Sequence, residues 1–104
     1  MKLVIALLIA ASAQVSAAHC LGEAQIIAKI DIVTKTGLSR CVATVTKYSI
    51  QMYNESMVCP LDLNEVIEQG IVVAFKDGHD CAFEAGQNIS GVLVKNSAGE
   101  IVLE

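Results

Sequence analysis

The stretch at residues 25–54, QIIAKIDIVTKTGLSRCVATVTKYSIQMYN, decides the fold because it predicts the two longest β-strands of the chain. In the first strand, residues 26–35, apolar and β-branched side chains take the even positions and charged side chains take three of the odd ones. Alternation with a period of two is typical of a strand with one buried face. Gly37 favours a turn at residues 36–39, and the second strand then covers residues 40–53.

The second strand changes its apolar face partway along. Such a change predicts a bulge or a sharp bend near Thr46 and Lys47, because neighbouring positions of a strand point to opposite faces. Strands that bend in this way allow a small sheet to curl into a barrel. The apolar row consists of Cys41, Ala43 and Val45 before the bend and of Tyr48, Ile50 and Met52 after it.

Residues 1–18 have the layout of a secretory signal peptide. One lysine precedes an unbroken apolar run at residues 3–11, and mostly small residues follow as far as Ala18. The apolar run is too short to span a bilayer, so we expect cleavage after Ala17 or Ala18 and no membrane insertion of the mature chain. The expected localisation is secreted or periplasmic, with residues 19–104 as a single domain.

The mature chain is small and acidic. Without the signal peptide it has eleven acidic and six basic residues, which gives a net charge of −5. An acidic surface repels phosphate backbones and anionic lipid headgroups, and we therefore expect no nucleic-acid partner. The expected partner is a protein or a small ligand, and the expected state is a monomer.

All four cysteines remain in the mature chain, and this even number predicts two disulfides in an exported domain of this size. No two of them have the C-x-x-C spacing of a redox motif or a zinc knuckle. Opposite residues of the hairpin have numbers that add up to about 75, which places Cys20 beyond its far end, near residues 55–59. Cys41 lies near the closed end. Among three possible pairings we therefore prefer Cys20–Cys59 with Cys41–Cys81.

The remaining elements are shorter. Asp62 and Glu65 have the spacing of a capping box, and Gly70 fits the position after a helix, so one helix of about two turns is predicted. The expected fold is mainly β: a small five-stranded antiparallel barrel of the OB-like Greek-key type, with the helix between strands 3 and 4 and two disulfides. A two-layer α+β arrangement or a small sandwich would give nearly the same pattern. The further strands are expected at residues 57–59, 71–75, 89–95 and 101–103, with a brief pairing at 81–83.

The chain offers few residues for catalysis, and we expect neither an enzyme nor a cofactor. A nucleophilic Ser or Cys needs a base within reach, and the chain has only two histidines, His19 and His79. An alternative is a small copper-binding carrier. After cleavage at Ala18, the amine and ring of an N-terminal His19, together with His79, would resemble the histidine brace of small periplasmic copper carriers. The neighbouring Cys20 would then have to be part of a disulfide.

The second strand also carries the candidate binding surface, because the second and third strands of an OB-like barrel usually form the binding face. Core packing is the alternative for Tyr48. The predicted function is an exported, non-catalytic binding or interaction module, with a secreted inhibitor or an envelope-structural protein as further alternatives. Asn54 and Asn88 begin N-glycosylation sequons at expected turns. The candidate surface consists of Lys47, Tyr48, Gln51 and Tyr53.

Overall fold

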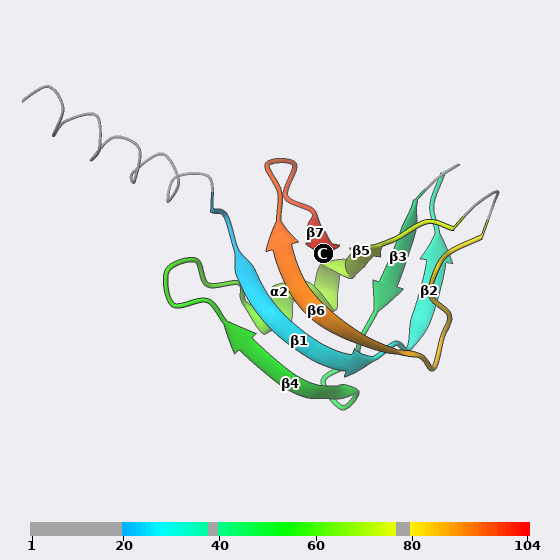
Figure 1. Cartoon of the computed structure of the whole chain (residues 1–104), viewed down its shortest axis with the longest axis horizontal. Helices are drawn as coiled ribbons and strands as arrows, with labels where there is room; N and C mark the ends of the chain where they lie inside the picture. Colours follow the sequence, from blue (N-terminus) through cyan, green and yellow to red (C-terminus); the bar gives the residue numbers. More distant parts are fainter. Residues whose placement is uncertain (1–19, 38–39, 77–79) are drawn as a thin grey trace, which may run out of the picture.

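The computed structural model describes residues 20–37, 40–76 and 80–104. The expected signal peptide, His19 and His79 lie outside these residues. The described chain forms one mixed sheet of seven strands that is curled into a half-barrel, with one short helix and two disulfides (Figure 1). Over the same residues, no helix has the length and apolar character needed to cross a membrane.

Hydrogen-bonded neighbours in the sheet follow the order β2-β3-β5-β7-β6-β1-β4. All neighbouring pairs are antiparallel except β5 and β7, which run parallel at Val72 and Val102. The prediction of a wholly antiparallel sheet is therefore wrong, because β7 turns back from β6 and so takes the direction of β5. The strands are β1 (Glu23–Lys29), β2 (Ile32–Lys35), β3 (Cys41–Thr44), β4 (Ile50–Glu55), β5 (Ile71–Val73), β6 (Asn88–Lys95) and β7 (Ile101–Leu103), and helix α2 (Leu63–Gln69) lies between β4 and β5.

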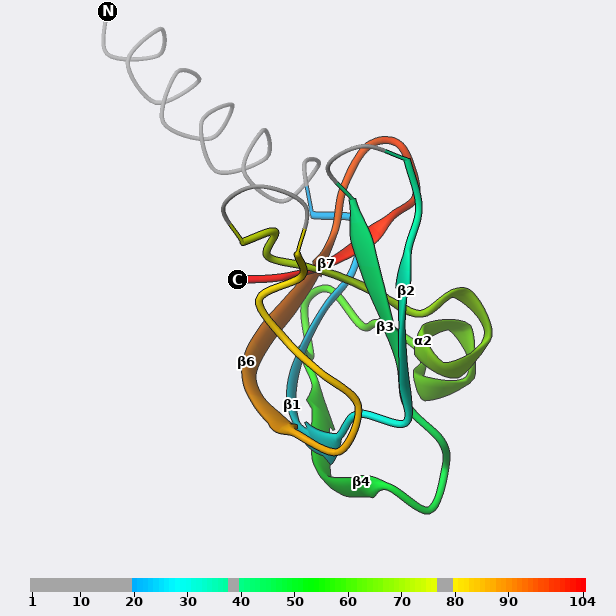
Figure 2. The ribbon, with the colours of Figure 1, turned by 90° about the vertical axis from the view of Figure 1, so that its right-hand side faces the viewer.

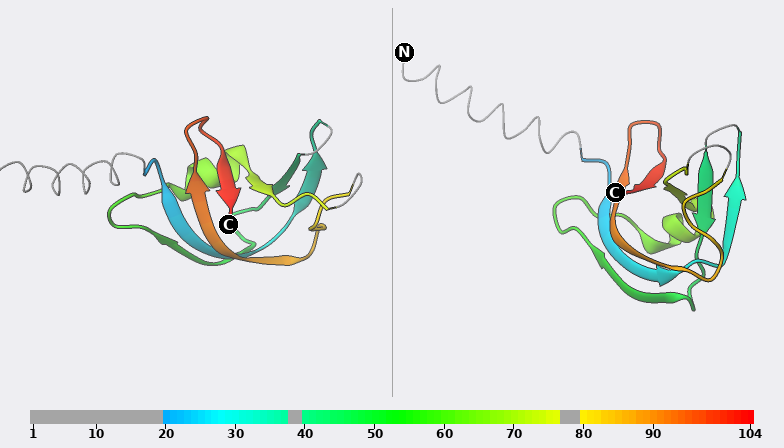
Figure 3. Two further views of the ribbon diagram at one scale, coloured as in Figure 1. Left: turned by 45° about the horizontal axis from the view of Figure 1, so that its top comes forward. Right: turned by 45° about the vertical axis from the view of Figure 1, so that its right-hand side comes forward.

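Each of the two long predicted strands is a bent pair of shorter strands, and the bend predicted near Thr46 and Lys47 is confirmed. A turn there ends β3, and the Ser49 N–H donates to the Thr46 carbonyl at 3.0 Å. Gln51 is then an extra residue, because Ile27 pairs with Met52 but the next residue of β1 pairs with Ile50. The turn and the bulge let β1 and β4 curve together with β6 (Figure 3).

The hairpin register near its closed end agrees with the sequence. Ile32 pairs with Thr44, so the residue numbers add up to 76, close to the expected value. At the far end Ile27 pairs with Met52, so the numbers add up to 79. The turn and the bulge insert the additional residues into the second strand.

Residues 57–59 form a bend and not the predicted third strand. Only Pro60, just beyond them, makes an isolated parallel bridge to Glu23. The Cys59 N–H donates to the Ser56 side chain, at 3.2 Å, so it is not available for a strand ladder. Helix α2 consequently follows β4, the second half of the second long predicted strand, with no further strand between them. The prediction that the helix lies between the third and fourth strands of the barrel is wrong.

The core lies inside the curl of the sheet. The alternation predicted for β1 holds as far as Ile30, which is buried, but Ile32 is 55% exposed and Val33 packs against the core instead. Because the chain bends between β1 and β2, the even-numbered residues face the core in β1, whereas Val33 faces it in β2. The buried side chains of the core cluster are Ala24, Ile26, Ala28, Ile30, Cys41, Ala43, Val45, Leu61, Val66, Ile71, Val73, Ile89, Leu93 and Ile101.

Helix α2 lies on one side of the curled strands (Figure 2). Val66 is buried in the core, and Glu65 forms an ion pair with Lys95 of β6. Asp62 occupies the N-cap position without a side-chain capping bond, and the Gly70 N–H donates to the Val66 carbonyl at 2.9 Å. The helix is held mainly by core packing.

Candidate functional site

The four side chains of the predicted binding surface differ in how far they are exposed. Lys47 and Tyr48 lie in the turn between β3 and β4, and Tyr48 is 94% exposed, so it is not packed in the core. Gln51 is exposed at the bulge. Tyr53 packs against the core, and its hydroxyl donates a 2.5 Å hydrogen bond to the Leu61 carbonyl. Tyr53 is therefore partly buried and bonded within the fold, whereas the other three side chains are exposed.

The phenol of Tyr53 is partly buried and contributes to the fold. Burial, followed by the nearby carboxylates of Glu55, Asp62 and Glu65, raises the pKa of Tyr53 to about 12. The phenol therefore keeps its proton at physiological pH and donates it to Leu61. This bond ties β4 to the segment that leads into α2.

Exposed apolar side chains lie in the loop between β4 and α2 and in the segment that the first disulfide joins to it. We call them the apolar tip: Met57 and Val58 of the loop, and Leu21 next to Cys20. Met57 is 99% exposed, Val58 82% and Leu21 50%. Leu21 belongs to the same region because the adjacent Cys20 is bonded to Cys59. Apolar side chains of this size are seldom left in water as a group unless they contact another molecule.

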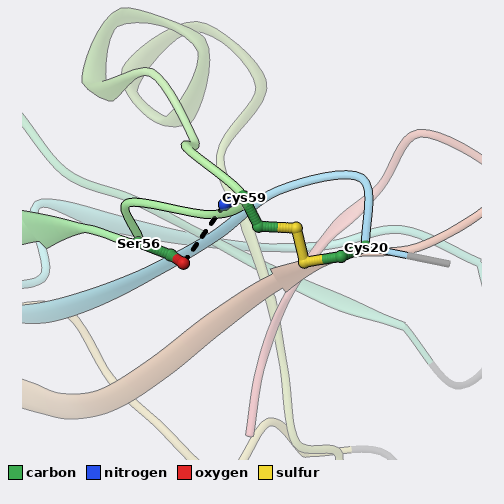
Figure 4. The surroundings of a disulfide bond; sticks show 3 residues. All are labelled: Cys20, Ser56 and Cys59. Carbon is green, nitrogen blue, oxygen red and sulfur yellow. Dashed lines mark hydrogen bonds between the residues drawn. A yellow bond between two sulfur atoms is a disulfide. The ribbon is translucent and has the colours of Figure 1, made fainter. Parts of the chain in front are cut away.

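The backbone that carries the tip is fixed from several sides. The Cys20–Cys59 disulfide holds it, with Cα atoms 5.9 Å apart, and the Cys59 N–H donates to Ser56 Oγ at 3.2 Å (Figure 4). The Glu23 N–H donates to the Cys59 carbonyl at 2.8 Å, and the Ser56 N–H donates to the Glu23 carbonyl at 2.9 Å. A loop held in this way loses little conformational entropy when it binds.

Carboxylates border the apolar tip. Glu55 and Asp62 are exposed on either side of the loop, and Glu23 is bonded to it through the backbone. Lys95 of β6 is paired with Glu65 in the first turn of α2. The tip is thus an apolar centre within an acidic surround, which disfavours contact with anionic surfaces.

A second candidate region is a hollow of about 540 Å³ beside β2. Its volume falls within the range of ligand pockets. One wall carries Cys81, which the second disulfide joins to Cys41 with Cα atoms 5.8 Å apart. The hollow is lined by Ile32, Val33, Lys76, Asp80, Cys81, Phe83, Glu84 and Ala85.

The two disulfides join Cys20 to Cys59 and Cys41 to Cys81, which is the pairing preferred from the sequence. In the described part of the chain, no group of three or more His, Cys, Asp or Glu side chains is arranged to hold a metal ion. Comparison of the chain with protein-family models, with curated proteins and with solved structures finds no significant match.

Sequence reasoning missed the apolar tip because Met57 and Val58 are two apolar residues beside a cysteine, which favours a short strand. Two signals point the other way. Ser56 can bond the backbone locally, and Pro60 cannot donate to a ladder. Read together with the expected Cys20–Cys59 bridge, they indicate a tethered loop.

Proposed function

We propose that this protein is an exported, non-catalytic binding module that contacts a partner protein through the apolar tip. The observation that carries the proposal is the near-complete exposure of Met57 and Val58 on a loop fixed by a disulfide and backbone hydrogen bonds. Methionine is common at binding surfaces because its flexible thioether adapts to irregular pockets. Two disulfides indicate an oxidising, extracytoplasmic environment, which supports a secreted or periplasmic location.

The apolar side chains of the tip are large enough to form the centre of a protein–protein interface. Complete burial of a Val, Leu or Met side chain contributes about 1.5–3 kcal/mol each. A few side chains with contributions of this size commonly dominate a protein interface. Because the loop is already ordered, less of this gain is lost to ordering on binding. An apolar pocket with a basic rim is the matching surface on the partner.

The strand connectivity supports an OB-like barrel as the scaffold. We count β1 with β2 as one bent strand and β3 with β4 as a second, so that β5, β6 and β7 become the third, fourth and fifth. The pairing then runs first, second, third, fifth, fourth and back to the first. This cyclic order is that of a five-stranded OB-type barrel. The helix departs from the expected layout, because it precedes the third strand.

A photo-crosslinking experiment tests the proposal. The mature chain carries benzoylphenylalanine at position 57 or, as a control, at position 48, where Tyr48 is 94% exposed in the turn between β3 and β4. Both are incubated with the extracytoplasmic fraction of the source cells. We expect one partner to be cross-linked from position 57 and not from position 48.

The purified partner is then titrated calorimetrically with the wild type, Met57→Asp and Tyr48→Asp. We expect Met57→Asp to weaken binding at least about tenfold, since a charge replaces a buried contact. Tyr48→Asp should bind like the wild type. Equal affinity of the wild type and Met57→Asp would overturn the proposal.

The predicted alternatives remain predictions. A copper carrier would depend on His19 and His79, which lie outside the described residues. A secreted inhibitor would use the same disulfide-fixed tip, in which case the partner cross-linked from position 57 would be an enzyme that the wild type inhibits and Met57→Asp does not. An activity assay of the identified partner separates this alternative from simple binding.

A further inference from the structure

Strand β2 stands at one end of the described sheet and has an open edge. The Thr36 N–H donates to the Arg40 carbonyl at 2.8 Å, and in the same register Thr34 pairs with Val42. Hydrogen-bonded and non-hydrogen-bonded pairs alternate along an antiparallel ladder. Val33 therefore lies in a non-hydrogen-bonded pair, and its N–H and C=O point away from β3.

The open edge borders the hollow of about 540 Å³ described above. Val33 lines this hollow from β2, and Phe83 lines it from the opposite segment. The opposite segment is held in place, since Phe75 and Cys81 form a bridge and the Ala82 N–H donates to the Ala74 carbonyl at 3.0 Å. The gap is thus bounded by a strand edge on one side and a fixed apolar wall on the other.

Charge adds a preference to this gap. Asp80 and Glu84 are exposed on its lining, and among the described lining residues Lys76 carries the opposite charge. Ile32 contributes an apolar surface that is 55% exposed. Exposed carboxylates next to exposed apolar side chains favour a ligand in which apolar and basic groups alternate.

We propose that this gap is a peptide-binding site, in which an extended segment of a partner protein adds to β2 as a further strand. The peptide backbone accepts a hydrogen bond from the Val33 N–H and donates one to the Val33 carbonyl. Its apolar side chains contact Val33 and Phe83, and a lysine or arginine lies near Asp80 and Glu84. The site is separate from the apolar tip and does not depend on it.

A peptide array tests this proposal on the mature, disulfide-intact chain. The probes are blocked five-residue peptides with valine at alternate positions and lysine, serine or glutamate between them. We expect the lysine peptides to bind at least tenfold more tightly than the glutamate peptides, with serine between. In NMR hydrogen exchange, the Val33 amide proton should become protected when the lysine peptide is added.

Matched controls separate strand addition from other modes of binding. N-methylation of the peptide amide that faces β2 should abolish binding and needs no protein variant. Asp80→Asn with Glu84→Gln should remove the preference for lysine, whereas Met57→Asp at the apolar tip should change nothing. The proposal is overturned if no peptide binds, if lysine and glutamate peptides bind equally, or if Phe83 signals shift while Val33 exchange does not.

Discussion

The Tyr53 hydroxyl donates a hydrogen bond of 2.5 Å to the carbonyl oxygen of Leu61. This bond spans the loop between β4 and α2 on its inner side, where Leu61 is buried in the core. The Cys20–Cys59 disulfide holds the same loop from another direction. The Tyr53–Leu61 bond and the disulfide thus add to the backbone hydrogen bonds with Glu23 in setting the position of the apolar tip.

Removing the Tyr53 hydroxyl should destabilise the fold measurably. Tyr53→Phe leaves the Leu61 carbonyl without this donor, and we expect the free energy of unfolding to fall by about 1 kcal/mol. Urea unfolding of the wild type and the variant measures the difference. Tyr48→Phe is the matched control, because the Tyr48 ring is almost fully exposed. Equal stability of Tyr53→Phe and the control would contradict the structural role of the bond.

Tyr53 should make the stability of the fold decrease at alkaline pH. The pKa of Tyr53 is about 12 in the folded chain against the ordinary value of 10.0, so the folded state holds the phenolic proton more tightly. The resulting stabilisation is complete below about pH 10 and is lost as the pH rises from about 10 to about 12. The unfolding free energy of the wild type should therefore decline more steeply in this range than that of Tyr53→Phe. Parallel slopes would show that the raised pKa does not contribute to stability.

The two disulfides should contribute unequally to stability. They close spans of 39 and 40 residues, for which loop-closure entropy predicts nearly equal losses of about 4 kcal/mol. Cys41 is fully buried in the core, so its replacement by Ala also leaves a small cavity. We expect Cys41→Ala/Cys81→Ala to lose about 1 kcal/mol more than Cys20→Ala/Cys59→Ala in urea unfolding. A larger loss for the second pair would contradict this ranking.

Gly70 should tolerate a side chain poorly. Its φ is +81°, and a Cβ there would lie 2.7 Å from Val42 Cγ1 and 3.3 Å from the Ala43 carbonyl oxygen. Gly99 has a similar φ of +84° with no atom within 4 Å of its Cβ position. Gly99→Ala should therefore cost about 1 kcal/mol from backbone strain alone, and Gly70→Ala about 3 kcal/mol from strain and overpacking. Thermal unfolding compares the two, and similar losses would refute the steric contribution.

The apolar tip should be dispensable for folding. Met57→Ala and Val58→Ala should each change the free energy of unfolding by less than about 0.5 kcal/mol, because both side chains are exposed. Leu61→Ala, two residues beyond the disulfide, should cost about 3 kcal/mol because Leu61 is buried. Guanidinium titrations provide the comparison. A stability loss in Met57→Ala comparable to that in Leu61→Ala would assign the tip to the folded core.

Local patterns of sequence predicted a large part of the scaffold. The alternation as far as Ile30, the hairpin closed by the bond from the Thr36 N–H to the Arg40 carbonyl, and the bend near Lys47 follow from side-chain period and glycine chemistry. Residues 38 and 39 of the predicted turn lie outside the described residues. The helix and its end at Gly70 follow from local signals of the same kind. The hairpin register also placed Cys20 near Cys59, since opposite positions of a hairpin can be counted along the chain.

The candidate sites could not be found by the same means. Ile32 continues the apolar row of the first strand, but the bend after Ile30 turns it outward to an open edge. Tyr53 was expected on a binding face, yet the bulge at Gln51 and the core around Leu61 turn it inward. Exposure depends on which segment covers a residue, and that segment is distant in the sequence.

The sequence by itself therefore determined the β class, the bend in the second long strand, the helix that ends before Gly70 and the basis for the cysteine pairing. Each of these depends on residues close together in the chain or on the register of one hairpin. Only the tertiary structure decided that β5 and β7 run parallel and that Met57 and Val58 form an exposed tip. It also decided that Val33 faces a hollow. These features arise where separate segments meet in the curled sheet, and local periodicity carries no information about such contacts.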